Sequence, residues 1–317
     1  MQAIVVRELG PPEVLVAEEV DDPVAGPGEV VVRASVANVT FVETQLRAGR
    51  GPFPVEPPYV PGNGVGGVVA AAGADVDPAL VGRRVVTATG GAGGYAELAA
   101  VPAAGLFEVP DGVELADAVA VLADGRTATM LVDAISPVAG LRVLVEAAAG
   151  GVGTLSVQLL ASAGAMVVGA VGGDRKLEVA QAAGAALVVD YSRPGWTDAV
   201  REQLGGVDAV LDGVGGDLAA AAFELVEPGG SFVSFGLASG TWADLPDELL
   251  AERGVQRVRP APTPDELRSL TERALRSLAD GTLRPVVGQR FPLASAAAAH
   301  AAIESRATVG KTLLDVG

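Results

Sequence analysis

The chain of 317 residues contains no cysteine and a single histidine, His300. Disulfide bonds, thiolate nucleophiles and thiolate metal sites are therefore excluded. Aromatic residues make up only 4% of the sequence, so the core must be built from Val, Leu and Ala. Basic residues are also scarce, with 22 Lys and Arg against 39 Asp and Glu and a net charge of −17. Such an acidic protein repels phosphate backbones, and we expect no nucleic-acid partner.

Long hydrophobic runs are missing as well. The apolar segment 166–171 is far too short to span a bilayer. At the N-terminus, Glu8, Glu13, Glu18 and Glu19 interrupt the apolar core that a signal peptide would need. We therefore expect a cytoplasmic protein with no membrane partner.

The sequence contains two kinds of pattern, and its length suits two domains. Up to about residue 115, short β-rich runs are punctuated by Gly and Pro, as in Gly26-Pro27-Gly28 and Pro61-Gly62. This pattern predicts a small, partly barrel-like β domain. From there to about residue 258, apolar strands alternate with helical stretches, which predicts an α/β, doubly wound parallel sheet covered on both faces. The strands are expected at Arg142–Glu146, Met166–Val171, Ala186–Val189, Asp208–Asp212 and Ser231–Phe235.

Two further helices and a last strand are expected after residue 258. Thr263, Pro264 and Glu266 have the spacing of a capping box that starts a helix running to about Ala279. An alanine-rich helix follows near residues 294–305. His300 lies within it among alanines, and we interpret it as a surface histidine rather than an acid-base group.

The most informative stretch is residues 143–153, Val-Leu-Val-Glu-Ala-Ala-Ala-Gly-Gly-Val-Gly. An apolar strand stops at small residues, and a helical pattern begins at Val152. The motif G-x-G-x-x-G is present with Ala148 in its first position and Gly150 and Gly153 in the others. Glycines let the backbone approach a pyrophosphate, and the helix N-terminus offers unpaired N–H groups. The alternative is a tight turn without a ligand.

The end of the second strand bears on the choice of cofactor. A free ribose 2′-hydroxyl favours an acidic residue there, but this chain has Gly172, which leaves space. Lys176 and Tyr191 could contact a 2′-phosphate, which favours NADPH over NADH. Asp174 is a counter-argument, and a solvated helix lysine is the alternative for Lys176.

These motifs together resemble the zinc-independent quinone oxidoreductases, the zeta-crystallin-like branch of the medium-chain dehydrogenases/reductases. The resemblance runs nearly end to end and is most specific from Gly140 to Gln158. It extends to Asp190-Tyr191, to Asp212-Gly213-Val214-Gly215-Gly216 and to the closing Gly310-Lys311. Thr127-Ala128 matches the family's threonine near the nicotinamide.

The resemblance implies a GroES-like catalytic domain formed by 1–117 and 259–317 and a Rossmann domain formed by 118–258. It also implies NADPH-linked reduction and a homodimer through an exposed sheet edge near Ser231–Phe235. The expected cofactor-binding residues are Thr127, Ala149, Gly150, Gly151, Val152, Gly153, Gly172, Lys176, Tyr191, Val214, Phe235, Gly236 and Leu237.

The ligand chemistry independently favours the zinc-free branch. A catalytic zinc takes about three protein ligands, usually from Cys, His or carboxylate groups, and this chain has no Cys and one His. Zinc-dependent relatives have a Gly-His-Glu segment where this chain has Gly62-Asn63-Gly64. We expect no bound metal.

The substrate cleft departs from the family pattern. Thr40 takes the place of an asparagine and Glu43 that of an aspartate, while Arg47-Ala48-Gly49 keeps the family's Arg-x-Gly. The tyrosine that acyl-thioester enoyl reductases often place after that glycine is absent. Thr40, Tyr59 and Asn63 are the candidate catalytic residues, and Phe41, Gln45, Phe53 and Asp124 are the candidate substrate-binding residues. For Asp124 a structural salt bridge is an equal alternative, and for each of the others packing or loop structure is at least an equal one.

Three functions remain open at this point. The first is NADPH-dependent reduction of a quinone or conjugated carbonyl, in which positioning of the acceptor matters more than a dedicated base. The second is reduction of the C=C bond of an enone or enoyl thioester. The third is a structural protein that binds NADPH without turnover.

Overall fold

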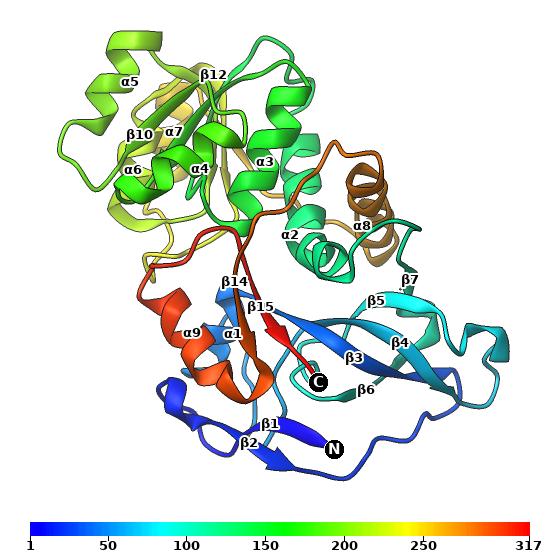
Figure 1. The fold of residues 1–317 in the computed structure, drawn as a ribbon. Coiled ribbons are helices and arrows are strands. Elements are labelled where there is room, and N and C mark those ends of the chain that lie inside the picture. The colour runs from blue at the N-terminus through cyan, green and yellow to red at the C-terminus, as the bar shows by residue number, and fades with distance from the viewer. The chain divides into compact units, whose positions relative to one another are not determined.

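The computed structural model describes residues 1–317, which form two compact units. The first unit contains 1–123, 275–279 and 285–317, and both chain termini belong to it (Figure 1). The second contains 124–274 and 280–284. This division differs from the expected domain boundaries mainly at 259–274, which group with the second unit.

The second unit is built on a six-stranded parallel sheet with the order β10-β9-β8-β11-β12-β13. The strands are β8 (Arg142–Glu146), β9 (Met166–Val171), β10 (Leu187–Asp190), β11 (Val207–Asp212), β12 (Val226–Ser234) and β13 (Gln256–Val258). The predicted α/β doubly wound fold is therefore confirmed. Apolar strands such as Val143-Leu144-Val145 are buried on both faces, as a parallel sheet requires.

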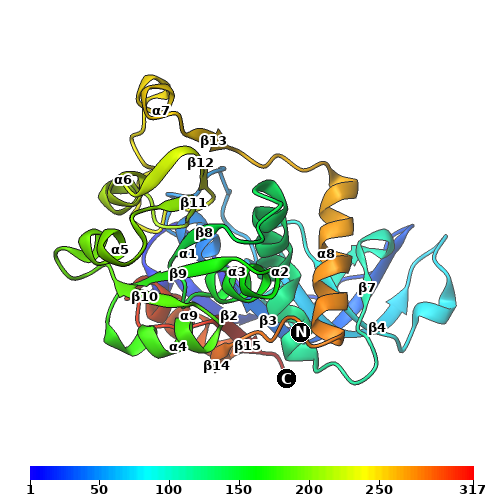
Figure 2. The ribbon, with the colours of Figure 1, turned by 90° about the horizontal axis from the view of Figure 1, so that it is seen from above.

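Helices cover both faces of this sheet, and they can be followed in Figure 2. One apolar core joins Val143 and Val145 to α2 (Leu115–Ala134), α3 (Gly151–Ser162) and α4 (Leu177–Ala182). The other joins Leu144 and Val210 to α5 (Trp196–Leu204), α6 (Gly216–Phe223) and α7 (Asp247–Arg253). The alternation of side chains along β8 thus divides the core into two layers.

The prediction that the segment Ser231–Phe235 forms an exposed edge of the sheet is wrong. Strand β12 lies between β11 and β13, and Ser231 pairs with Gln256 of β13. The edge strand on this side of the sheet is the short β13, and its charged and polar residues Gln256 and Arg257 form no apolar run that sequence analysis could detect.

The first unit is β-rich, as expected. Its larger sheet has the order β14-β15-β3-β4-β5-β7, with β6 also paired to β3, and a hairpin pairs β1 with β2. The strands are β1 (Gln2–Val6), β2 (Leu15–Glu19), β3 (Glu29–Val39), β4 (Gly64–Ala72), β5 (Arg84–Ala88), β6 (Leu98–Pro102), β7 (Phe107–Glu108), β14 (Val287–Pro292) and β15 (Lys311–Asp315). This unit also holds two short helices, α1 (Phe41–Arg47) and α9 (Ala296–Glu304), together with the start of α2 and the end of α8 (Pro264–Ala279).

Helix α8 begins at the predicted capping box. Glu266 accepts hydrogen bonds from the Thr263 N–H (2.7 Å) and hydroxyl (2.9 Å), and the Glu266 N–H donates to the Thr263 hydroxyl (3.3 Å). Two N-terminal donors are thereby satisfied, which confirms the prediction. None of the helices combines the length and the apolar character needed to cross a membrane.

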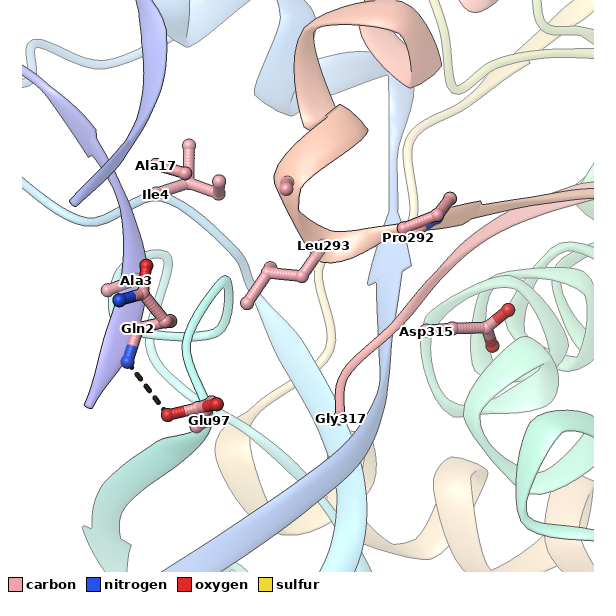
Figure 3. A pocket seen from close by; sticks show the side chains of 10 residues that line it. Gln2, Ala3, Ile4, Ala17, Glu97, Pro292, Leu293, Asp315 and Gly317 are labelled. Atoms are coloured by element: carbon pink, nitrogen blue, oxygen red, sulfur yellow. Dashed lines mark hydrogen bonds between the residues drawn. The ribbon is translucent and has the colours of Figure 1, made fainter. Parts of the chain in front are cut away.

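A cavity of about 360 Å³ opens beside β1 in the first unit (Figure 3). Ile4, Ala17 and Leu293 give it an apolar lining, and Glu97 closes one side by accepting a hydrogen bond from the Gln2 N–H (2.7 Å). None of the predicted site residues lines this cavity.

Candidate functional site

The predicted cofactor residues gather at one edge of the parallel sheet in the second unit. The turns that carry them follow β8, β9, β10, β11 and β12, so all lie at the carboxyl ends of parallel strands. Ligands bind along this edge in doubly wound sheets. Thr127 and Asp124 are separate from these turns, because both lie on α2, where Asp124 is buried and Thr127 half-buried.

The glycine turn brings α3 very close to the end of β8. A Cβ on Gly153 would lie 2.2 Å from the Ala147 carbonyl oxygen, so only glycine fits. Ala147 has a φ of +50°, and its carbonyl accepts a hydrogen bond from the Gly150 N–H (2.8 Å). The N–H groups of Gly151, Val152 and Gly153 lie in the first turn of α3, where a helix leaves donors without an internal acceptor. This cradle fits a pyrophosphate.

The Tyr191 ring packs directly against the end of β9, and it can do so only because Gly172 has no side chain. A Cβ there would lie 2.8 Å from Cε2 of the Tyr191 ring, which follows β10. The backbone N–H of Tyr191 donates to the Val171 carbonyl (2.8 Å), which fixes the tyrosine at this place. Gly172, Tyr191 and Lys176 are thus grouped around the ends of β9 and β10.

Asp174, the residue that weighed against NADPH, has a cationic partner. Its carboxylate forms an ion pair with Arg193, which also lies 3.4 Å from the Asp190 carboxylate. Asp190 in turn accepts hydrogen bonds from the Gly173 N–H (2.9 Å) and the Ser192 hydroxyl (2.7 Å). Arg193 therefore offsets the negative charge of Asp174 and Asp190 beside the ends of β9 and β10. Sequence analysis did not identify Arg193, whose role depends on the pairing of β9 with β10.

The turns that follow β11 and β12 are organised by buried Asp212. Its Oδ1 accepts from the Val214 N–H (3.0 Å) and the Gly215 N–H (2.7 Å), and its Oδ2 accepts from the Ser234 hydroxyl (2.8 Å). Its backbone carbonyl accepts from the Phe235 N–H (2.9 Å). A single residue thus holds the turns that carry Val214, Phe235, Gly236 and Leu237.

A second buried carboxyl group, Glu146, adjoins Asp212. It ends β8, only 1% of it is exposed, and neither of its oxygens accepts a hydrogen bond from a protein N–H or O–H donor. Burial raises the pKa of Glu146 well above its usual range, and the charge of Asp212 and a side-chain hydrogen bond with it raise that pKa further, while the nearby Val214 N–H acts in the opposite direction.

In the first unit, the candidate residues are organised by buried Glu43 on α1. Its carboxylate accepts from the Thr40 N–H (2.5 Å), the Thr40 hydroxyl (2.8 Å) and the Asn63 N–H (2.7 Å). Burial raises the pKa of Glu43, and its hydrogen bonds and buried Lys311 oppose that rise. The structure thus brings Thr40 and Asn63 together. The spacing Thr40-x-x-Glu43 is a capping-box signature that sequence analysis could have used.

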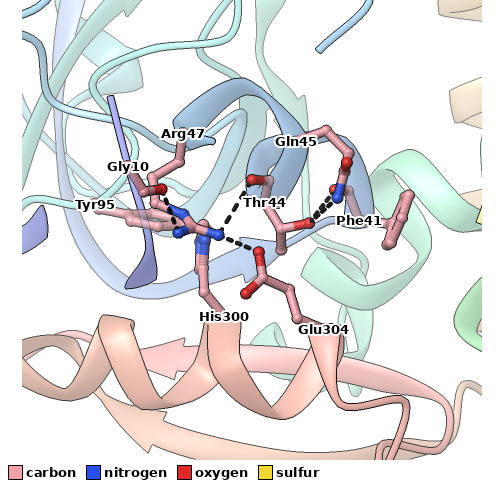
Figure 4. Close-up of polar contacts among 8 residues, drawn as sticks. All are labelled: Gly10, Phe41, Thr44, Gln45, Arg47, Tyr95, His300 and Glu304. Carbon is pink, nitrogen blue, oxygen red and sulfur yellow. Dashed lines mark hydrogen bonds and ion pairs between the residues drawn. The ribbon is translucent and has the colours of Figure 1, made fainter. Parts of the chain in front are cut away.

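Arg47 links α1 to α9 (Figure 4). The guanidinium is 1% exposed, donates to the carbonyls of Gly10 (2.6 Å) and Thr44 (3.3 Å) and forms an ion pair with Glu304. On the same helix, the Gln45 amide donates to the Thr44 hydroxyl (3.0 Å), which donates to the Phe41 carbonyl (2.7 Å). Gln45 is therefore held by its own helix.

The expectation that His300 is a surface residue is wrong, because its side chain is fully buried. Its Nε2 lies 3.0 Å from the Tyr95 hydroxyl, and the two rings meet edge to face at 5.8 Å. Burial lowers the pKa of His300 to about 3, and the charge of Arg47 acts in the same direction, so the imidazole is neutral. Ala296, Ala299, His300 and Ile303 follow helical spacing, and this stripe is the signal that sequence analysis missed.

Tyr59 lies between α1 and β4 and is half-buried. Its hydroxyl is buried without a hydrogen-bond partner, while its backbone exchanges hydrogen bonds with Val6 (2.9 and 3.0 Å). Burial raises its pKa, and the charges of Arg47 and Glu43 act on it in opposite directions. Phe53 differs from the others, since half of it is exposed in a loop.

Comparison with known proteins identifies the family. Residues 26–111 match the alcohol dehydrogenase GroES-like domain, and residues 183–314 match the model described as zinc-binding dehydrogenase. A quinone oxidoreductase of Pseudomonas aeruginosa is 34% identical over 96% of each chain. A 2-haloacrylate reductase of a Burkholderia species is also 34% identical, over 99% of this chain and 98% of that protein.

The fold leads to the same group of proteins. The Escherichia coli quinone oxidoreductase solved with NADPH is 29% identical, with a TM-score of 0.92 over 99% of this chain and 100% of that one. Full-length identity, the GroES-like unit and the parallel-sheet unit agree. The chain belongs to the quinone oxidoreductase branch of the medium-chain dehydrogenases/reductases, and it is an NAD(P)H-dependent oxidoreductase.

Proposed function

We propose that this chain binds NADPH and reduces a quinone or a conjugated carbonyl without zinc. The observation that best supports NADPH as the cofactor is the group of residues at the ends of β9 and β10. Gly172 lets the Tyr191 ring pack against the end of β9, Lys176 follows on the chain, and Arg193 pairs with Asp174. A phosphate on the ribose 2′-oxygen would meet cationic side chains there rather than an unpaired carboxylate.

The zinc-free part of the proposal rests on ligand chemistry. The chain has no cysteine, and its single histidine is buried against Tyr95. A catalytic zinc needs about three protein ligands, and carboxylates would have to supply them all. We therefore propose that this chain binds no catalytic zinc, although the family model that it matches is described as zinc-binding dehydrogenase.

Reduction of the acceptor requires a hydride and a proton. Bound NADPH supplies the hydride, and the chain's own task is to orient the acceptor and supply or relay the proton. We infer that Thr40, Tyr59 and Asn63 form the polar part of the substrate site, with Phe41, Gln45, Phe53 and Asp124 as further contacts. Tyr59 is the best proton donor of these, because burial keeps its unpartnered hydroxyl protonated.

A second function is reduction of an activated C=C bond. It is favoured by the equally similar 2-haloacrylate reductase. In this reaction the hydride reaches one carbon and a proton the other, so a positioned acid such as Tyr59 matters more than with a quinone.

An acceptor panel distinguishes these functions. Purified protein and NADPH are incubated with ortho-quinones, para-quinones, enones, 2-haloacrylate and enoyl thioesters, and NADPH oxidation is followed. We expect turnover of quinones, and Tyr59→Phe should slow C=C reduction more than quinone reduction. Turnover of thioesters but not quinones would overturn the first choice. Tight NADPH binding without any turnover would support the structural-protein alternative.

The same preparation tests the remaining proposals. We propose a cytoplasmic homodimer that acts on a small molecule and has no nucleic-acid or membrane partner. Strand β13 is one of the two open edges of the sheet, and a second copy could extend it because its outer backbone groups lack strand partners. Light scattering should give the mass of two chains, and elemental analysis should find no stoichiometric zinc. A monomer or bound zinc would contradict these proposals.

A further inference from the structure

Glu146 and Asp212 place two buried carboxyl groups side by side under the cofactor edge of the sheet. Strands β8 and β11 pair in parallel, with Val145 opposite Leu211, so Glu146 and Asp212 are the next residues of the two strands. Residues at matching positions of paired strands point to the same face. Glu146 is 1% exposed and Asp212 is fully buried.

The hydrogen bonds assign different charges to the two groups. Asp212 accepts three hydrogen bonds from the Val214 and Gly215 N–H groups and the Ser234 hydroxyl, which stabilise a carboxylate. Neither oxygen of Glu146 has a hydrogen-bond partner of good geometry, and the Val214 N–H, which donates to Asp212, is the one backbone donor that acts on Glu146 as well. Two ionised carboxylates cannot hydrogen-bond each other, but a carboxylic acid can donate to a carboxylate.

No positively charged side chain stabilises an ionised Glu146 in place of a proton on its carboxyl group. On the other side of Glu146, β9 presents Ala170 opposite it. Neither Glu146 nor Asp212 forms an ion pair with any lysine or arginine, and Asp212 is the charged side chain that acts on Glu146. Without the proton, two like charges would adjoin in a buried site, which is strongly unfavourable.

We propose that Glu146 is a positioning residue that works as a neutral acid, donating one hydrogen bond to Asp212 and so holding the turns after β11 and β12 in the form that binds the nicotinamide end of NADPH. This inference rests on the proposed NADPH function. Glu146 ends the strand that leads into the glycine turn, while Asp212 holds Val214 and, through its carbonyl, Phe235. A single proton shared by Glu146 and Asp212 therefore connects the glycine turn after β8 with the turns after β11 and β12.

A neutral Glu146 makes both the stability of the protein and its affinity for NADPH depend on pH. The pKa of Glu146 is raised in the folded protein, so its contribution to stability is complete below the unfolded pKa and is lost as pH rises through the folded pKa. NADPH affinity should fall over the same range, by at most about tenfold per pH unit for one proton.

Glu146→Gln tests this directly, because an amide keeps a donor for Asp212 and does not titrate. NADPH binding is measured by nucleotide fluorescence from neutral to alkaline pH for the wild type, Glu146→Gln and the control Glu202→Gln, which makes the same change on an exposed part of α5. We expect the wild type and Glu202→Gln to lose affinity as pH rises, while Glu146→Gln keeps it. Urea unfolding of the cofactor-free proteins should show Glu146→Gln gaining stability over the wild type as pH rises.

A second variant covers the case in which Glu146→Gln does not fold. Asp212→Asn removes the neighbouring charge, so the pH at which affinity falls should move to lower values than in the wild type. Parallel pH profiles for the wild type and Glu146→Gln, or an unmoved transition in Asp212→Asn, would overturn the proposal. If none of the proteins binds NADPH at neutral pH, the proposed function fails instead.

Discussion

At the scale of single residues, burial decides which polar groups are free to act. Thr40 and Asn63 were expected as catalytic groups, and the structure gives both a hydrogen bond to Glu43. The Thr40 hydroxyl and the backbone N–H of Asn63 are thus already engaged in positioning α1 and the segment before β4. The Tyr59 hydroxyl differs because it has no partner, which makes it the residue with most chemical freedom in this group.

His300 gives a prediction at the same scale. Its pKa is lowered from about 6.5 to about 3, so between those values the unfolded chain binds a proton that the folded chain does not. Stability should therefore fall as pH drops through this window, with a slope of up to about 1.4 kcal/mol per pH unit from this group. His300→Gln removes the titration while keeping a polar group near Tyr95.

The measurement is urea unfolding of the wild type and His300→Gln between pH 7 and roughly pH 4. The difference between the two free energies of unfolding should shift in favour of His300→Gln as pH falls. A difference that stays constant would mean that His300 titrates alike in the folded and unfolded chain, and the account of a buried neutral imidazole would be wrong.

At the scale of elements, the close approach of α3 to β8 shapes the cofactor edge. Gly153→Ala would force a Cβ to within 2.2 Å of the Ala147 carbonyl oxygen, so the backbone must shift. We expect a loss of roughly 2–4 kcal/mol in stability and a large loss of NADPH affinity.

Gly150→Ala is the matched control in the same turn. Its Cβ would lie 3.2 Å from the same oxygen, and its φ of −83° suits any residue. This variant should lose much less stability in urea unfolding and less affinity in the NADPH titration. Equal losses for the two variants would contradict the idea that close packing at Gly153 controls the turn.

The elements that sequence analysis predicted well were those with a local signal. The apolar strand Arg142–Glu146 and the capping box at Thr263 were both found as expected. The elements that sequence analysis missed depend on contacts between segments that are far apart in the sequence. Strand β13 is only three residues long and exists because Ser231–Val233 offers it a partner. The partners Glu43 with Asn63 and Tyr95 with His300 likewise come from segments far apart in the chain.

At the scale of the whole molecule, the expected cofactor residues divide cleanly from the expected substrate residues. Every cofactor residue lies in the second unit, and every substrate residue except Asp124 lies in the first. The strand ends and the glycine spacing from which we predict the cofactor residues are local signals. The substrate residues follow no such rule, because loops and α1 position them.

The central claim is that the ends of β9 and β10 select NADPH. The most direct measurement is a titration of the purified protein with NADPH and with NADH, followed by nucleotide fluorescence, for the wild type, Lys176→Ala and Lys176→Arg. The wild type should bind NADPH more tightly. Lys176→Ala should weaken NADPH by roughly tenfold and NADH little, and Lys176→Arg should retain most of the affinity. Tighter binding of NADH by the wild type, or equal losses for both nucleotides in Lys176→Ala, would contradict the account.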